Sequence, residues 1–458
     1  MHTLDLTTDE LLDALLQIAE TETVCILDSC GVGHLGSHLL IAGIKPVEVR
    51  EINNDDPVKT LALLDDRLTS HLASIFTISY EFGLKLKGVS PRSKNDHTPT
   101  EPDVFLASFD ALIIHDYDSG KTWLAGNQKK HMQIERRLSS PISNFKSQIP
   151  DPNSDLAGES SAAVSNFSRH QYLSAIVTIK ECIRQGDTYQ TNLTQQLTVK
   201  LRDQMSPAEV FTNLRKQHPA SFSAFIRRPD STVISASPER FFRVETPVAG
   251  DGSSRKITTS PIKGTRERGA TKEQDIALRI DLLNSKKDRA ENTMIVDLLR
   301  NDLGRVCGYG SVQAEQLCDL EEHPTLFHLV STVSGTLRDD ARFSDILRSL
   351  FPCGSITGAP KLSTMRMIDE IETADRGLSM GAIGYCIPPN FAGLEPAIDL
   401  SVAIRTMVIR DGVATFNVGG GIVIDSDPAK EYAESLLKAK ALLRALGVTQ
   451  TLFGQTKS

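Results

Sequence analysis

Apolar residues follow two spacings along the chain, and each spacing predicts a different kind of element. Between 172 and 183, one Tyr and three Ile recur three or four residues apart, which is typical of the buried face of a helix, and Gly186 is placed to end it. Residues 189–194 then alternate, with Tyr189 and Leu193 on one side and Gln190 on the other. Such alternation predicts a β-strand.

The same two patterns extend over most of the sequence. Thr7 and Glu10 predict a capping box that opens a helix, and residues 111–124 predict a β-hairpin that carries Trp123. Because strands come in runs and helices come in runs, we predict an α+β fold with large, mainly antiparallel sheets. Strands are predicted at 23–27, 38–44, 221–226, 232–236, 240–244, 326–334, 381–387, 397–408 and 414–418, and helices at 57–72, 271–283, 288–303, 361–372 and 428–446.

A change in composition suggests how the chain is divided. Residues 139–168 are rich in Ser, Pro, Asn and Asp, and we interpret them as a long surface connection. The predicted organisation is an N-terminal lobe at 1–138, this connection, a catalytic domain at 169–446 and a C-terminal tail at 447–458.

Composition narrows the classes of partner. The 458 residues are enough for a sizeable core, and the net charge of −8 argues against nucleic acid or an anionic membrane as the main partner. Residues 1–10 lack an apolar signal core, and no apolar run reaches membrane-spanning length. Seven scattered cysteines without a C-x-x-C pair favour a reducing, cytoplasmic location.

Lys263 is the strongest candidate for chemistry. It lies between Pro261 and Gly264, with Arg266 and Arg268 close behind. Neighbouring cations and partial burial both favour the neutral amine, which is the nucleophilic form of lysine. The alternative is a solvated lysine in a basic loop.

Two predicted helices begin with carboxylates. Asp288 and Glu291 share one face of the first, and Glu431 and Glu434 share one face of the second, which Asp427 can cap. Acids near helix N-termini are favoured by the helix dipole alone. Two such pairs also suit a hard cation such as Mg²⁺, which takes oxygen ligands.

Two further segments could bind an anion. The three glycines at 419–421 would allow close backbone approach to an anion, or they form a tight bend. Arg405 is embedded in an apolar strand and needs an anion, either a structural carboxylate or a substrate carboxylate.

Two titratable residues lie beside apolar ones. Glu239 precedes Phe241 and Phe242, so burial would raise its pKa and suit a general acid, although an ion pair with Arg240 is the simpler reading. His328 lies on an alternating strand, as a core histidine or as a group near a substrate.

Taken in order, these segments resemble the chorismate-utilising enzymes, which include anthranilate synthase component I, aminodeoxychorismate synthase component I, and the isochorismate and salicylate synthases. The resemblance covers about residues 169–445 and implies an anthranilate-synthase-like fold, with two large β-sheets packed together and flanked by helices. The N-terminal lobe is only loosely similar. The matching segments are 186–194, 237–241, 261–265, 288–304, 328–333, 354–361, 403–406 and 419–434.

Two positions distinguish activities within the family. Its water-adding members carry a lysine base where this chain has Gln190, so Gln190 implies a user of ammonia. Its anthranilate synthases carry Ala where this chain has Lys263, which resembles aminodeoxychorismate synthase component I. The implied activity is amination of chorismate at C4, in p-aminobenzoate and folate biosynthesis.

The resemblance also implies residue roles. Lys263 would attack C2 while Glu239 protonates the departing C4 hydroxyl, and ammonia would then enter at C4 and expel the lysine; His328 would lie near the ring. Glu291 and Glu434 would hold Mg²⁺ directly, with Glu431 and Asp288 in support. The substrate-binding residues would be Gln190, Thr265, Tyr385, Arg405, Gly419, Gly420 and Gly421.

The sequence shows no convincing glutaminase triad, so ammonia would come from a separate glutamine amidotransferase subunit in a heterodimer. Two alternatives remain. One is an anthranilate synthase component I, which aminates the ortho position and has no use for Lys263. The other is an inactive sensor that binds chorismate or tryptophan.

Overall fold

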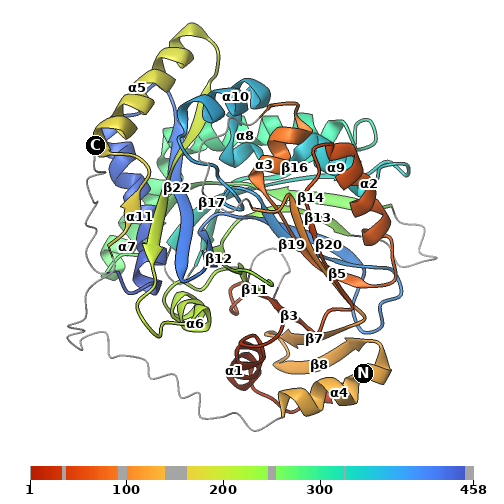
Figure 1. Ribbon diagram of the computed structural model, residues 1–458. Coiled ribbons are helices and arrows are strands. Elements are labelled where there is room, and N and C mark those ends of the chain that lie inside the picture. The colour runs from red at the N-terminus through yellow and green to blue at the C-terminus, as the bar shows by residue number, and fades with distance from the viewer. Residues whose placement is uncertain are drawn as a thin grey trace.

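The chain is organised around two antiparallel β-sheets (Figure 1). The structure, a computed structural model, describes residues 2–33, 38–90, 101–139, 162–245, 254–323 and 326–448. Every strand pair within these ranges is antiparallel. The predicted α+β class with large, mainly antiparallel sheets is therefore confirmed.

The first sheet has 12 strands among the described residues. It begins with N-terminal strands and continues, through the β2–β11 pair, into strands from the second half of the chain. Its spatial order is β1 (His2–Leu4), β8 (Lys121–Gly126), β7 (Ala111–Asp116), β3 (Leu39–Ile44), β2 (Val24–Asp28), β11 (Phe222–Arg227), β12 (Thr232–Ser237), β21 (Thr406–Arg410), β22 (Val413–Ile422), β10 (Gln190–Lys200) and β18 (Gly358–Ala359), with β9 (Val164–Ser165) also on β10.

The second sheet has 10 strands in the same ranges. It also combines N-terminal strands with strands from later in the chain. The N-terminal strands join it through the pairing of β5 with β19. Its order is β15 (Ile262–Glu267), β17 (Leu326–Thr336), β14 (Lys256–Ser260), β13 (Arg240–Glu245), β20 (Ala397–Val402), β19 (Ala382–Ile387), β5 (Ala73–Ile78), β6 (Val104–Phe109) and β4 (Glu48–Ile52), with β16 (Gln313–Glu322) also on β17.

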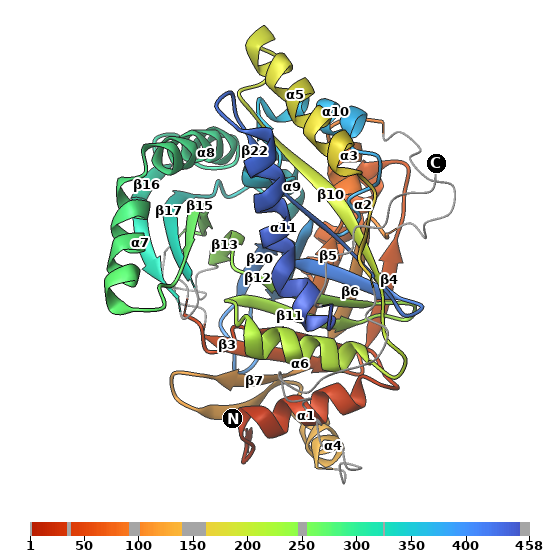
Figure 2. The same cartoon turned by 90° about the vertical axis from the view of Figure 1, so that its left-hand side faces the viewer.

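Helices cover the outer faces. Figure 2 shows α11 running along β22, and α7 and α8 beside β15 and β17. The helices are α1 (Thr8–Ile18), α2 (Pro57–Leu68), α3 (Tyr80–Leu86), α4 (Gln128–Leu138), α5 (Arg169–Gln185), α6 (Pro207–Gln217), α7 (Lys272–Asn284), α8 (Lys286–Gly304), α9 (Phe343–Leu350), α10 (Lys361–Ile371) and α11 (Pro428–Ala445), with a 3₁₀ turn η1 (Gly354–Ile356).

Strand alternation explains the layers. In β2, Ile26 faces a cluster shared with α1, α6 and α11, whereas Cys25 faces the cluster between the sheets. In β5, Ile75 faces the cluster between the sheets and Phe76 faces the outer helices. Because successive side chains of a strand point to opposite faces, each sheet buries both faces. The result is a helix–sheet–sheet–helix stack.

The chain passes between the two sheets several times, and two of these crossings are neighbours. It leaves the first sheet after Ser237 and enters the second at Arg240; it returns between Val402 and Thr406. The two crossings are bonded to each other: the Val402 amide donates to the Glu239 carbonyl and the Ala236 amide to the Arg405 carbonyl, both at 3.0 Å. Residues 238–239 and 403–405 therefore lie side by side where the sheets separate.

Most predicted elements are confirmed. The predicted helices at 271–283, 288–303, 361–372 and 428–446 each end within two residues of α7, α8, α10 and α11, and Gly186 ends α5 in the left-handed conformation. One strand prediction is wrong: 397–408 is two strands, because the chain changes sheets there and Arg405 takes a left-handed φ of 49°. Neither α6 nor α9 was predicted, nor were the strands β4 to β6 and β14 to β16.

The predicted boundary at 139–168 does not separate sheets. Strands from 1–138 extend both sheets that the later strands build. Residues 140–161 of that connection, and 449–458 of the predicted tail, lie outside the described residues.

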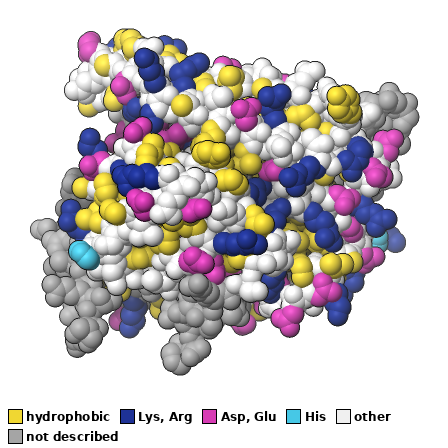
Figure 3. Space-filling view, turned by 90° about the horizontal axis from the view of Figure 1, so that it is seen from above, with side chains coloured by type: hydrophobic (Ala, Val, Ile, Leu, Met, Phe, Trp, Pro, Cys, Tyr) yellow, Lys and Arg dark blue, Asp and Glu magenta, His cyan; other side chains and the backbone are white. Residues whose placement is uncertain are grey.

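One face of the molecular surface carries charged and apolar side chains side by side (Figure 3). Seen from above, Lys and Arg side chains are interspersed with Asp, Glu and apolar ones on the visible face (Figure 3). Along the described part of the chain, no helix has the length and apolar character needed to cross a bilayer.

Candidate active site

Lys263 lies on an edge strand, not in a loop. β15 pairs with β17 at Ile262 and again from Thr265, with a register shift between them. Gly264 sits in that irregularity at a φ of +89°, where a Cβ would come within 2.9 Å of Asp288. A bulge of this kind redirects the side chain beside it. The Lys263 amine donates to the Ser355 carbonyl at 3.0 Å.

The environment of Lys263 supports the neutral amine, although the predicted cause was partly wrong. Burial lowers the pKa of Lys263, and the nearby Lys438 lowers it further, whereas Glu291 and Glu239 oppose this. Arg266 and Arg268 do not contribute to the shift. Each is held by acids: Arg266 by Asp281 and Asp288, and Arg268 by Asp275.

Glu239 is a buried carboxyl at the first sheet crossing. It is 4% exposed, and its Oε1 has no hydrogen-bond partner in the described structure. Burial raises its pKa, against hydrogen bonds from the Ser355 side chain and the Ile262 amide and the charge of Lys263. Arg240 pairs with Asp399 instead, so the simpler reading, an ion pair between Glu239 and Arg240, is wrong. A carboxyl of this kind can donate a proton near neutral pH.

The starts of α8 and α11 approach each other. The Lys287 amine lies 3.8 Å from Glu291 Oε1 and 3.7 Å from Glu431 Oε1. Burial raises the pKa of Glu291, whereas Lys438, at 2.9 Å, lowers the pKa of Glu434. Three of the four predicted metal residues therefore share one charged neighbourhood.

Asp288 is held elsewhere. Its carboxylate accepts from Arg266 at 3.1 Å. Across the described chain, no three His, Cys, Asp or Glu side chains stand close enough to form a ready metal cage. The positive charge between Glu291 and Glu431 is the ammonium of Lys287. These two acids thus already share one cation, and the buried Glu291 Oε1 has no hydrogen bond among the described atoms, which fits a hard cation as ligand.

The three glycines lie inside β22, not at a bend after it. They pair with β10, and a Cβ on Gly419 would meet the Leu193 carbonyl at 1.9 Å. A Cβ on Gly420 would lie 3.6 Å from Glu431 and 3.9 Å from Glu434. Among the described strands, β21 pairs with β22 only as far as Thr415. Past Thr415, the side of β22 away from β10 is an open edge of the described sheet. Because successive N–H groups of a strand point to opposite sides, at least one N–H of the three glycines faces that edge.

Gln190 lies beside this strand. It is fully buried, and neither amide atom has a hydrogen-bond partner among the described groups. A Cβ on Gly421 would come within 2.4 Å of its Nε2. Since buried amides normally find partners, an unmet one beside the glycine strand is suited to a bound ligand.

Arg405 lies at the second sheet crossing. It is partly buried, and burial lowers its pKa. No ion pair to Arg405 occurs within the described ranges, and a substrate carboxylate as its partner stays a prediction. His328, 2% exposed, has its ring 5.1 Å from that of His323 and lies across from Thr265, which is exposed.

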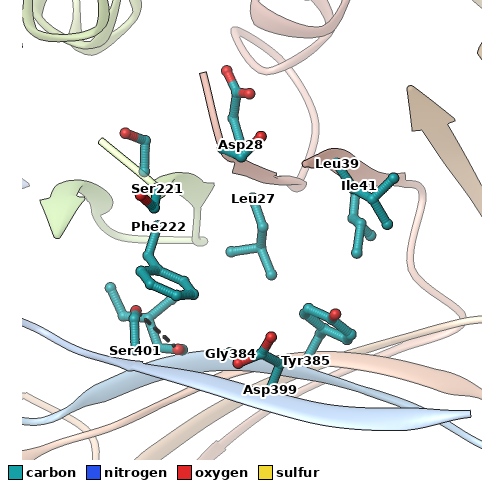
Figure 4. A pocket seen from close by; sticks show the side chains of 13 residues that line it. Leu27, Asp28, Leu39, Ile41, Ser221, Phe222, Gly384, Tyr385, Asp399 and Ser401 are labelled. Atoms are coloured by element: carbon teal, nitrogen blue, oxygen red, sulfur yellow. Dashed lines mark hydrogen bonds between the residues drawn. The ribbon is translucent and has the colours of Figure 1, made fainter. Parts of the chain in front are cut away.

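Tyr385 is not brought to this site. It lines a separate cavity of about 40 Å³ between the sheets, opposite Leu27 and Asp28 (Figure 4). Burial and Asp399 raise its pKa to about 12. Tyr385 therefore faces this separate cavity, and its role in holding substrate stays a prediction.

Sequence reasoning missed three residues of the site. Ser355 contacts both Lys263 and Glu239, and Lys287 and Lys438 neutralise the acids. The helical spacing of Lys287 to Glu291 and of Glu434 to Lys438 was a usable signal. Nothing in the sequence signals a backbone carbonyl as a partner 92 residues away from Lys263.

Comparisons with known proteins identify relatives over most of the chain. The profile of a family described as chorismate binding enzyme matches residues 24–444. The anthranilate synthase component 1 of Pseudomonas putida is 36% identical over 375 residues, which cover 80% of this chain and 72% of that protein. The aminodeoxychorismate synthase of Streptomyces pristinaespiralis is 37% identical over 399 residues, which cover 84% of this chain. The chain spans about half, 53%, of the length of that relative.

One solved structure is also similar over most of the chain. The crystal structure of anthranilate synthase component I from Streptococcus pneumoniae superposes with a TM-score of 0.73 at 27% identity, covering 90% of this chain and 93% of that one.

Proposed function

Because this chain belongs to the chorismate-binding enzyme family, we propose that it aminates chorismate at C4, giving 4-amino-4-deoxychorismate through a covalent Lys263 intermediate. The observation that carries the proposal is the pairing of Lys263 with Glu239. Both contact Ser355, and their pKa values are shifted in opposite directions, toward a neutral amine and a neutral acid. Titratable groups whose environments shift them in this way are suited to nucleophile and acid roles.

The reaction balances with these two groups. The neutral Lys263 amine forms a bond to C2, the ring double bonds shift, and the C4 hydroxyl leaves as water with the proton of Glu239. Ammonia then bonds to C4, the double bonds shift back, and the C2–N bond breaks to release the amine. The carboxylate of Glu239 recovers its proton from the new C4 ammonium. Two allylic displacements replace one difficult step.

The other residues would hold the substrate. Arg405 supplies a planar fork suited to a carboxylate, and the open edge of β22 supplies backbone N–H groups. Glu291, Glu431 and Glu434 would hold Mg²⁺, which would neutralise the ring carboxylate when bound. Lys287 would then give up its place between Glu291 and Glu431, whereas Asp288 would stay with Arg266.

We also propose that ammonia comes from a separate glutamine amidotransferase subunit. A relative of similar coverage is named component 1, a name that implies a second component. We assign Gln190, whose amide has no partner among the described groups, to receiving that ammonia.

The deciding experiment is to identify the product formed from chorismate, Mg²⁺ and ammonium salt. The proposal predicts 4-amino-4-deoxychorismate without pyruvate release. Fluorescent ortho-aminobenzoate would instead assign anthranilate synthase. Binding of chorismate with no turnover at high ammonia would favour the sensor.

Replacing Arg405 should weaken substrate binding. We expect Arg405→Met to raise KM for chorismate roughly 10–100-fold, because a charge-assisted hydrogen bond contributes about 1.5–3 kcal/mol. Arg405→Lys keeps the charge without the fork, so its KM for chorismate should lie between that of the unmodified protein and that of Arg405→Met. Steady-state kinetics with ammonia measures this; an unchanged KM in Arg405→Met would mean that the guanidinium faces no substrate anion.

Replacing Glu291 should raise the Mg²⁺ requirement. We expect Glu291→Gln to need roughly 10-fold more Mg²⁺ for half-maximal activity, since it removes a charged oxygen ligand. Asp288→Asn is the matched control on the same helix face and should shift the requirement less than about 3-fold, because Arg266 holds that carboxylate. Equal activity of the unmodified protein in chelator and in Mg²⁺ would remove the metal from the proposal.

A further inference from the structure

Arg376 is a buried arginine behind the candidate site, 3% exposed. Its Nε and Nη2 donate to the two carboxylate oxygens of Glu372 at 2.9 and 2.7 Å, and its guanidinium carbon lies 4.5 Å from the centroid of the Tyr80 ring. A fork-to-fork pair of this kind fixes the plane of the guanidinium.

The guanidinium also reaches two backbone carbonyls on separate elements. Nη1 donates to Ile356 at 3.0 Å, in η1, and Nη2 donates to Asn192 at 2.7 Å, in β10. Ile356 directly follows Ser355 in the chain. Asn192, which is two residues after Gln190, pairs with Gly421. One side chain thus joins the turn behind Lys263 to the strand beside the glycines.

Glu372 strengthens the same link. Its Oε1 accepts from the amide of Thr194 at 2.7 Å and from the Thr194 hydroxyl at 2.9 Å. The pair therefore holds β10 at two places and η1 at one, in a region with little water to replace a lost bond.

The turn it holds contacts both reacting groups. The Ser355 carbonyl accepts from the Lys263 amine, and the Ser355 side chain lies close enough to Glu239 to lower the pKa of that carboxyl. If the Ser355–Ile356 peptide rotates, the amine and the acid lose their common anchor. A lysine at 376 could not replace the arginine, because an ammonium donates from one point and cannot span Glu372, Ile356 and Asn192.

We propose that Arg376 is a positioning residue for the amination reaction: together with Glu372 it locks the Ser355–Ile356 turn against β10 and so sets Lys263 against Glu239. This inference rests on the proposed roles of Lys263 and Glu239.

The test compares Arg376→Lys with a matched control, Arg228→Lys. Arg228 is also buried (1% exposed), is paired with Glu101, and lies 5.0 Å from the Phe105 ring centroid. It bonds Thr77 of β5 and none of the site residues. Both variants are measured below their melting temperatures for kcat, for KM, and for the rate at which an amine reagent modifies Lys263 at one fixed pH, located by mass spectrometry.

We expect Arg376→Lys to lower kcat roughly 10–100-fold with KM for chorismate within about 3-fold, because small misplacements of reacting groups are costly. Its Lys263 modification rate should change by more than about 3-fold, whereas Arg228→Lys should change kcat and that rate by less than about 2-fold. If Arg376→Lys does not fold, Glu372→Gln, which keeps the acceptor shape, should show the same split.

Two results overturn the inference: activity losses that follow the melting temperature equally in both variants, or an unchanged Lys263 modification rate in Arg376→Lys. The modification rate needs no turnover. If the unmodified protein does not consume chorismate, the proposed function fails while the labelling comparison still decides the role of Arg376.

Discussion

Replacing Lys263 by Ala should reduce formation of 4-amino-4-deoxychorismate by at least about 10³-fold, equivalent to about 4 kcal/mol of transition-state stabilisation. The reason is that the two other amines near the described site have partners: Lys438 donates to the Gly419 carbonyl and pairs with Glu434, and Lys287 is shared by two acids. Chorismate binding should persist, because the anion-holding groups are on other elements. Calorimetric binding and product analysis together measure both quantities.

Two variants serve as controls for that result. Lys263→Arg keeps a cation but provides no neutral nucleophile, so it should be as inactive as the alanine variant. Lys256→Ala removes an exposed lysine from β14, the strand that precedes β15 in the chain, and should leave turnover within about 2-fold. A mass increase at Lys263 after trapping with chorismate alone would place the covalent bond directly. Full activity in Lys263→Ala would refute the nucleophile role.

Glu239→Gln should lower kcat by roughly 10²–10⁴-fold, the usual contribution of a positioned general acid. The active form of the protein needs a protonated Glu239 and a neutral Lys263. Activity should therefore fall at low pH, where Lys263 is charged, and fall again at high pH, where Glu239 is ionised. Because the pKa of Glu239 is raised and that of Lys263 lowered, the two limbs lie closer together than for ordinary side chains.

The pH profile of Glu239→Gln distinguishes an acid from a merely polar residue. The remaining activity should rise with pH as Lys263 loses its proton and then stay level, since no acid is left to ionise. Glu245→Gln changes an exposed carboxylate at the end of β13, the strand that follows Glu239, and should keep the bell shape. A bell-shaped profile in Glu239→Gln would assign the acid to another group.

The elements that could be predicted from the sequence were those with strong local signals. The capping box at Thr7 and Glu10 and the glycine at 186 are local chemistry, and both are present. The wrong strand at 397–408 shows the limit: apolar residues occupy most of its positions on both sides of Arg405, so periodicity does not reveal that the chain changes sheets there. The short strands β5 and β6 are buried on both faces, so their apolar and polar residues do not alternate clearly.

The charged residues of the candidate site could be predicted from their type, but the groups that contact them could not. Lys263, Glu239 and Glu291 were recognisable because each combines charge with apolar or helix-start surroundings. Ser355 acts through its backbone carbonyl, which any residue supplies, so its type carries no signal. Tyr385 was assigned from the resemblance alone, outside the matching segments, and residue type does not fix which face of a sheet a side chain takes.

The interleaved sheets have a consequence for how the chain is made. β5 must wait for β19 as its neighbour, and β2 must wait for β11. Ala382 leaves the ribosome about 300 residues after Ile78, which at 5–20 residues per second is roughly 15–60 s. During that interval the first strands carry open edges that can pair with other nascent chains. Expression at reduced temperature or with added chaperone should therefore raise the yield of folded protein more than trimming at residue 138, which would make those edges permanent.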